Sequence, residues 1–222
     1  MMKIATIKTI PIYIHWSFWI LFALILYFFG IYPIFVISFS ILVHELGHAA
    51  MATRFNKNVE KIALTGFGGY TLIENKKIPK PKEEILIALA GPLANIALCF
   101  VAMPFLFLKS AIFFTLTLYF IATNAIVGIA NLVPTYPLDG AHVFRGLLRI
   151  KYNELFATKV VSIFGIVITF FWAFFTATYS NHSILVEFFW CIIFFELNIR
   201  EYKYIRDYYI NVELILNRMR KL

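Results

Sequence analysis

The chain has 222 residues, of which 61% are apolar and only 14% are charged, and its formal net charge is +8. A soluble globular domain is about half apolar and about a quarter charged, so this composition excludes an ordinary soluble protein and indicates one integral membrane domain. The positive charge does not indicate nucleic-acid binding, because it is confined to loops and chain ends. Cys99 and Cys191 both lie in apolar runs, and we interpret them as small apolar residues, neither a disulfide nor metal ligands.

Six apolar runs follow one another along the chain, each near the ~20 residues that a bilayer core requires. We therefore predict an all-α polytopic membrane protein of about six transmembrane helices, with a small re-entrant β-hairpin after the second. A short basic segment precedes the first run, and a charged, aromatic tail follows the last. The expected spans are residues 12–30, 33–55, 84–108, 111–133, 156–179 and 183–199.

Lysine and arginine residues indicate the orientation of these spans, because cytoplasmic loops carry the excess of positive charge. With six spans, 19 of the 20 basic residues fall on one side of the membrane, Lys109 being the exception. The sequence thus predicts both termini in the cytoplasm. We expect His182 to be solvated in the short external loop, and we assign no role to Glu187 in the sixth span.

The second apolar run contains His44, Glu45 and His48, which spell H-E-x-x-H. Residues four apart share a face of a helix, so the two imidazoles can bind one metal ion. Glu45 lies beside that face and can act as a general base on a water molecule at the metal. The alternative is a chance pair of buried histidines, which is costly in a membrane helix because no water is present to satisfy them.

A third protein ligand is needed, and Asp139 is the best candidate. It lies in N-L-V-P-T-Y-P-L-D-G (residues 131–140), where Pro134, Pro137 and Gly140 interrupt the helix. Irregular backbone at membrane depth is tolerated where it lines a polar cavity, so an aspartate there can reach a metal on another helix. The spacing equally allows Asp139 to be a solvated turn residue or the N-cap of a following helix.

The loop after the second run contains G-F-G-G (residues 66–69) followed by Y-T-L-I. Glycines favour a tight hairpin, and the residues after them favour a strand. An exposed strand edge could pair with an unwound substrate, and on this interpretation Gly68 and Gly69 contact substrate. A plain surface hairpin is the alternative.

Taken together, H-E-L-G-H, G-F-G-G, A-G-P-L-A-N (residues 90–95) and the later N-L-V-P-T-Y-P-L-D-G resemble the site-2 protease family of intramembrane zinc metalloproteases. The resemblance is strongest to its sporulation branch. It implies that His44, His48 and Asp139 bind Zn²⁺ and that Glu45 is the catalytic base. The family often has a second glycine after Asp-Gly, whereas this chain has Ala141 and a histidine.

The resemblance also implies substrate-binding roles for Asn131 and Asn95. Asn131 matches an asparagine proposed to bind substrate or the oxyanion, with a helix–helix hydrogen bond as the alternative. Asn95 forms a Gly-x-x-x-Asn pattern with Gly91, for which close helix packing is the alternative. His142 is expected to make no direct metal bond.

The resemblance implies an intramembrane endopeptidase that cuts a membrane-embedded or membrane-associated protein near the cytoplasmic face, releasing a regulatory factor such as a pro-sigma factor. Its partners would be the substrate, the lipid bilayer and regulatory membrane proteins, not nucleic acid. We expect a protease domain over residues 1–199 and an amphipathic tail over 200–222, which lies on the membrane or docks a partner, without a PDZ or CBS domain. The alternatives are an inactive relative that binds membrane segments and a metal transporter.

Overall fold

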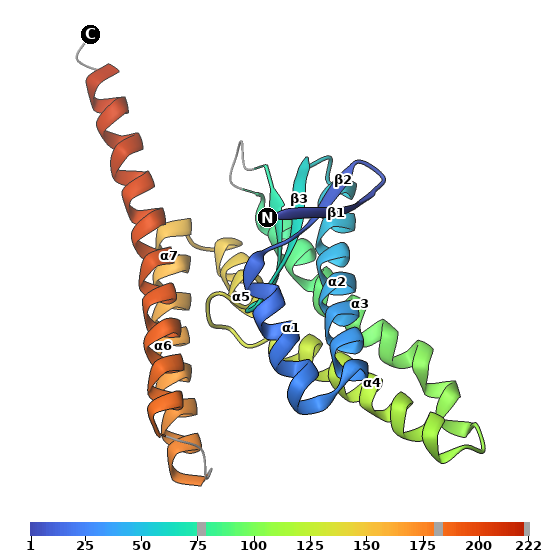
Figure 1. Cartoon of the computed structure of the whole chain (residues 1–222). Helices are drawn as coiled ribbons and strands as arrows, with labels where there is room; N and C mark the ends of the chain where they lie inside the picture. Colours follow the sequence, from blue (N-terminus) through green and yellow to red (C-terminus); the bar gives the residue numbers. More distant parts are fainter. Residues whose placement is uncertain (75–78, 180–183, 220–222) are drawn as a thin grey trace. The chain divides into compact units, whose positions relative to one another are not determined.

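The computed structural model describes residues 1–74, 79–179 and 184–219 (Figure 1). By its internal contacts the chain forms two compact units, Met1–Asn131 and Leu132–Leu222. Each unit is described by itself below. The expected external loop with His182 lies outside the described residues.

The first unit is built on helices that follow the predicted apolar runs: α1 (Trp16–Phe29), α2 (Ile31–Arg54), α3 (Pro81–Ala102) and α4 (Ala111–Ala130). A short 3-10 helix, η1 (Met103–Phe107), extends α3. Helix α2 packs against α3, and α3 packs against α4. These contacts place the central turns of α2, which carry H-E-x-x-H, against α3.

The start of the first expected span, residues 12–30, was predicted wrongly, because residues 12–14 belong to a strand and not to a membrane helix. Strands β1 (Met2–Ile7) and β2 (Ile10–Ile14) form an antiparallel hairpin. Helix α1 begins only after His15, whose Nδ1 accepts a hydrogen bond from Ser17 N. With 14 residues, α1 is shorter than the ~20 that cross a bilayer core.

A β-hairpin follows α2 and belongs to a four-stranded sheet, so the expectation of an all-α fold with one hairpin needs correction. That the hairpin is re-entrant in the membrane stays a prediction. Strands β3 (Val59–Thr65) and β4 (Gly68–Ile73) join the first two in the order β1-β2-β3-β4. The β2–β3 pair is parallel and the outer pairs are antiparallel. The sheet lies beside the C-terminal half of α2 (Figure 1), where Ile12 and Ile62 pack on Ala49 and Ala52.

The second unit contains α5 (Asp139–Arg149), α6 (Glu154–Tyr179) and α7 (Ile184–Met219). Helices α6 and α7 lie side by side (Figure 1). The sixth span was expected to end at residue 199, but α7 is 36 residues long and ends at Met219. No proline or glycine interrupts this stretch, so the helix extends beyond the ~30 Å of a bilayer core.

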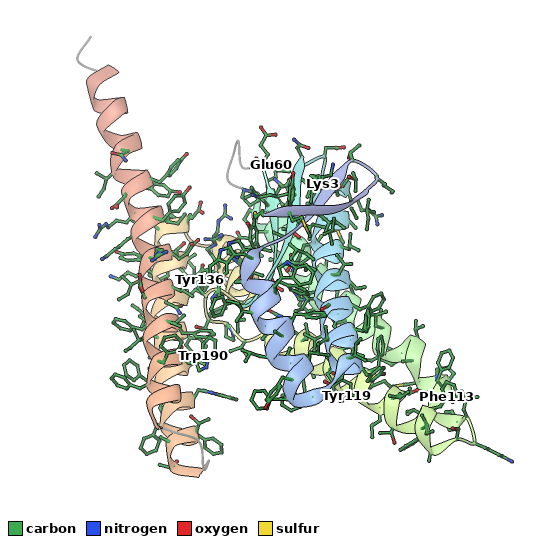
Figure 2. All side chains as sticks on the ribbon, viewed as in Figure 1. Lys3, Glu60, Phe113, Tyr119, Tyr136 and Trp190 are labelled. Carbon is green, nitrogen blue, oxygen red and sulfur yellow. The ribbon has the colours of Figure 1, made fainter. Side chains whose placement is uncertain are left out.

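Four helices in the described residues are long and apolar enough to cross a membrane, which makes this an integral membrane protein. They are Ile31–Arg54, Pro81–Phe107, Ala111–Ala130 and Glu154–Thr178. Figure 2 shows the charged side chains of Lys3 and Glu60 on the sheet and the apolar side chain of Phe113 projecting from α4. The count of six spans stays a prediction.

Candidate active site

His44 and His48 lie one turn apart on α2, and their side chains face α3. Their ring centroids are 4.7 Å apart at an interplanar angle of 83°, and each ring offers a nitrogen within 4.8 Å of the other's. Both residues are buried. Two imidazoles in this arrangement can bind one metal ion, as the four-residue spacing predicts.

Hydrogen bonds at Nδ1 indicate which nitrogen of each ring would bind a metal. His44 Nδ1 lies 2.7 Å from Asn95 Oδ1, and His48 Nδ1 lies 2.7 Å from the backbone oxygen of Ile87. A carbonyl oxygen can only accept, so each Nδ1 carries the proton and each Nε2 keeps its lone pair. This is the tautomer that a metal-binding histidine requires, and the site therefore fits a zinc ion.

Gly91 on α3 provides the space in front of the two Nε2 atoms. A methyl group at this position would contact Nε2 of His48 and would lie 2.8 Å from Nε2 of His44. Both nitrogens thus point to the same small volume beside α3. The sequence suggested close helix packing at Gly91. In the structure, the absence of a side chain at Gly91 leaves room for the imidazole rings of His44 and His48.

Asn95 is fully buried and joins three helices by hydrogen bonds. Its Oδ1 accepts from His44, while its Nδ2 donates to Ser40 O at 3.0 Å and to Asn124 Oδ1 at 2.9 Å. Asn124 in turn donates to Phe120 O on its own helix α4. These bonds give Asn95 an orienting role toward the His44 ring, and its contact with substrate stays a prediction.

Asn124 was missed at the sequence level, although a signal was available. It is a lone amide within the apolar run that became α4, and it is fully buried. Such a group in a membrane helix requires a partner from a neighbouring helix. The sequence does not reveal which residue that partner is.

Glu45 is buried and lies against strand β4. Thr71 Oγ1 donates a hydrogen bond of 2.7 Å to Glu45 Oε2. A methyl group at Gly69 would lie 2.7 Å from Glu45 Oε1, so only glycine allows this approach of the strand. Gly68 begins β4 at a φ of +124° and accepts a hydrogen bond from the Thr65 hydroxyl through its backbone oxygen.

Asn131, which was predicted to contact substrate, is the C-cap residue of α4. Its Nδ2 donates to Val127 O one turn earlier at 2.9 Å. The side chain is partly exposed. Its role toward substrate stays a prediction.

Asp139 is the first residue of α5, in the second unit, and is partly exposed. The loop before it is fixed by Asn198 of α7, which is fully buried. Asn198 Nδ2 donates to Thr135 Oγ1 at 3.0 Å and to Tyr136 O at 3.2 Å, and its Oδ1 accepts from Tyr136 N at 3.3 Å. Asn198 was not among the functional residues predicted from the sequence.

A second group of contacts connects α5 to α7. Arg145 is buried and forms a 2.9 Å ion pair with Glu201, and its second guanidinium nitrogen lies 3.3 Å from His142 Nδ1. Its guanidinium also lies over the ring of Tyr136, 5.9 Å from the centroid. His142 therefore contacts Arg145, one turn later on α5.

Comparison with known proteins identifies the relatives of this chain. Residues 32–116 and 108–173 match the family model "Peptidase family M50". The zinc metalloprotease MJ0392 of Methanocaldococcus jannaschii is 34% identical over 143 residues, which are 60% of this chain and 39% of that protein. Stage IV sporulation protein FB of Bacillus subtilis is 34% identical over 131 residues, or 59% of this chain and 45% of that protein.

A solved structure, the site-2 protease from Methanocaldococcus jannaschii, is also similar. It matches with a TM-score of 0.65 at 26% identity over 90% of this chain and 94% of that structure. The matched part of the chain spans less than half the length of the two curated relatives.

Proposed function

This chain belongs to peptidase family M50, and we propose from that premise that it is an intramembrane zinc endopeptidase. Its relatives include proteins named zinc metalloproteases and a structure named a site-2 protease. Its own membrane-length helices match the requirement for activity within a bilayer. The substrate would be a membrane-embedded or membrane-associated protein, cut near the cytoplasmic face.

One observation carries this proposal: the Nε2 atoms of two buried imidazoles point to one small volume beside Gly91, and a buried carboxylate follows the first of them on the same helix. The Nδ1 contacts to Asn95 and Ile87 fix both rings in the metal-binding tautomer. Buried ionisable groups in a membrane helix are costly and mark function.

We assign Asp139 as the third zinc ligand beside His44 and His48. Catalytic zinc sites take three protein ligands and leave one position open. Asp139 follows an irregular loop and is the first residue of α5. The L-D-G motif within the family resemblance supports the same assignment.

In this proposal the residues of the chain divide the chemistry between them. Zinc, when bound, would supply a Lewis acid that activates water and polarises the scissile carbonyl. Glu45 would accept the proton of the attacking water and pass it to the leaving amine. Asn95 and Ile87 O would keep the histidine rings in the required tautomer.

A helical substrate must unwind before cleavage, because its carbonyls are bonded within its own helix. We propose that the unwound segment pairs with β4, which is an edge strand of the described sheet. Gly68 and Gly69 at the start of β4 would contact it, and Asn131 would bind its backbone. We propose that cleavage releases a regulatory factor such as a pro-sigma factor. Both termini of the protease would lie in the cytoplasm.

The experiment that tests this function compares wild type with Glu45→Gln in detergent. Wild type should contain about one zinc per chain and should cleave a single-span membrane substrate. Glu45→Gln should keep its zinc and lose about 10²- to 10⁴-fold in rate, because general-base catalysis is removed. Cleavage by Glu45→Gln at the wild-type rate would refute the mechanism, and absence of both zinc and cleavage in wild type would favour an inactive relative that binds membrane segments.

A further inference from the structure

Strand β4 contacts Glu45 through two residues of one face, Gly69 and Thr71. Residues two apart in a strand point to the same side, so both face α2. A methyl group at Gly69 would lie 2.6 Å from Glu45 Cγ and 2.8 Å from Ile41 Cγ2. The glycine therefore brings the strand into direct contact with the carboxylate side chain, and the next inward residue is Thr71.

The hydroxyl of Thr71 reaches the carboxylate and the backbone of the same residue. Its Oγ1 lies 2.7 Å from Glu45 Oε2 and 3.0 Å from Glu45 O. Glu45 itself is only 5% exposed, so bulk water competes weakly with this bond. A hydrogen bond to a charged acceptor in such a place strongly favours one orientation of the acceptor.

We propose that Thr71 is a positioning residue that fixes the direction of the Glu45 carboxylate. This inference rests on the proposed function of Glu45 as the general base. A glutamate has several rotatable side-chain bonds, and a general base must point at the proton that it removes. The hydroxyl of Thr71 selects one Glu45 conformer before the substrate arrives.

The position of Thr71 also connects base orientation to substrate binding. Thr71 lies on β4, the edge strand to which we assign the substrate. Its backbone is paired with Ile62 of β3 on the inner side. A movement of β4 during substrate pairing would therefore move the Thr71 hydroxyl that holds the Glu45 carboxylate.

Three variants of the full chain test this role: Thr71→Val, Thr71→Ser and, as a control, Thr53→Val. Valine keeps the shape of threonine and removes the donor, whereas serine keeps the donor. Thr53 lies on α2, as Glu45 does, but its hydroxyl donates to Ala49 O of its own helix. The substrate is a fluorogenic single-span peptide in detergent, and kcat, KM and zinc content are measured for each protein.

Thr71→Val should lower kcat about 10- to 100-fold, the range for a hydrogen bond to a charged group, with KM and zinc content unchanged. Thr71→Ser should restore most of kcat, and Thr53→Val should behave as wild type. A purely structural role would instead change KM, zinc content or thermal stability. Equal kcat in Thr71→Val and wild type, with Glu45→Gln inactive, would overturn the role of Thr71 and leave the proposed function intact.

Infrared difference spectroscopy provides a readout that does not depend on turnover. The difference between wild type and Glu45→Gln identifies the carboxylate band of Glu45. In Thr71→Val this band should shift, because its hydrogen-bond donor is lost, and in Thr71→Ser it should return. An unshifted band in Thr71→Val would also overturn the inference, and an inactive wild type would overturn it together with the proposed function.

Discussion

The two units of this chain fix their parts of the proposed site in different ways. In the first unit, His44, Glu45 and His48 lie within five residues of one helix, so regular helical geometry already places them on neighbouring faces. In the second unit, Asp139 follows an irregular loop. Its conformation depends on Asn198, which is 62 positions from Tyr136, its bonding partner. Local helical geometry thus determines the positions of the histidines, whereas long-range hydrogen bonds determine the conformation of the loop before Asp139.

The largest effect should come from removing the aspartate. Asp139→Ala should reduce zinc content from about one per chain to a small fraction and abolish cleavage, because a two-histidine site lacks the third protein ligand of a catalytic zinc centre. Metal analysis after dialysis checks the result, with Asp207→Ala as a matched control, since Asp207 is exposed and pairs with Arg206. Full zinc content in Asp139→Ala would assign the third ligand elsewhere.

A methyl group at Gly91 should reduce zinc binding nearly as much, because it acts on the two histidine ligands. Gly91→Ala would place the methyl group against both Nε2 atoms, so it competes with a metal ion for the same space. We expect zinc content and cleavage to fall together while helical circular dichroism is retained. A variant with normal zinc content would show that the histidines bind metal away from α3.

Loss of the Asn95 side chain should weaken the site without emptying it. Asn95→Leu leaves His44 Nδ1 without its acceptor, and removal of such an outer partner typically costs about 10- to 100-fold in metal affinity. Competition with a fluorescent zinc chelator measures this affinity. Asn124→Leu, one bond further from the metal, should cost less, and a larger loss there than in Asn95→Leu would contradict the orienting role.

The smallest effect on zinc should come from Asn198, because it acts on the aspartate loop and not on a ligand. Asn198→Leu leaves polar backbone atoms of Tyr136 buried without this partner, at a cost of about 1–3 kcal/mol for each. Thermal unfolding should therefore shift downward, with a several-fold loss in zinc affinity. Asn211→Leu, an exposed position on the same helix, should change neither quantity.

The same contrast explains what the sequence could and could not predict. H-E-x-x-H and four membrane-length helices were predictable, because both follow from local periodicity. The partners of Asn124, Thr71 and Asn198 were not predictable, because they lie on other elements of the fold. The N-terminal strands were missed because the apolar stretch of residues 10–29 is continuous in composition, and only the weak N-cap at His15 separates β2 from α1.

Zinc K-edge X-ray absorption on the purified full chain tests the central claim most directly, because it reports the ligands of the metal itself. The account predicts a four-coordinate site with two imidazole nitrogens and oxygen ligands at about 2.0–2.2 Å. In Asp139→Ala, reloaded with zinc, the protein oxygen ligand should be lost while the two imidazole contributions persist. A sulfur ligand, a single imidazole or an unchanged spectrum in Asp139→Ala would contradict the assignment of His44, His48 and Asp139.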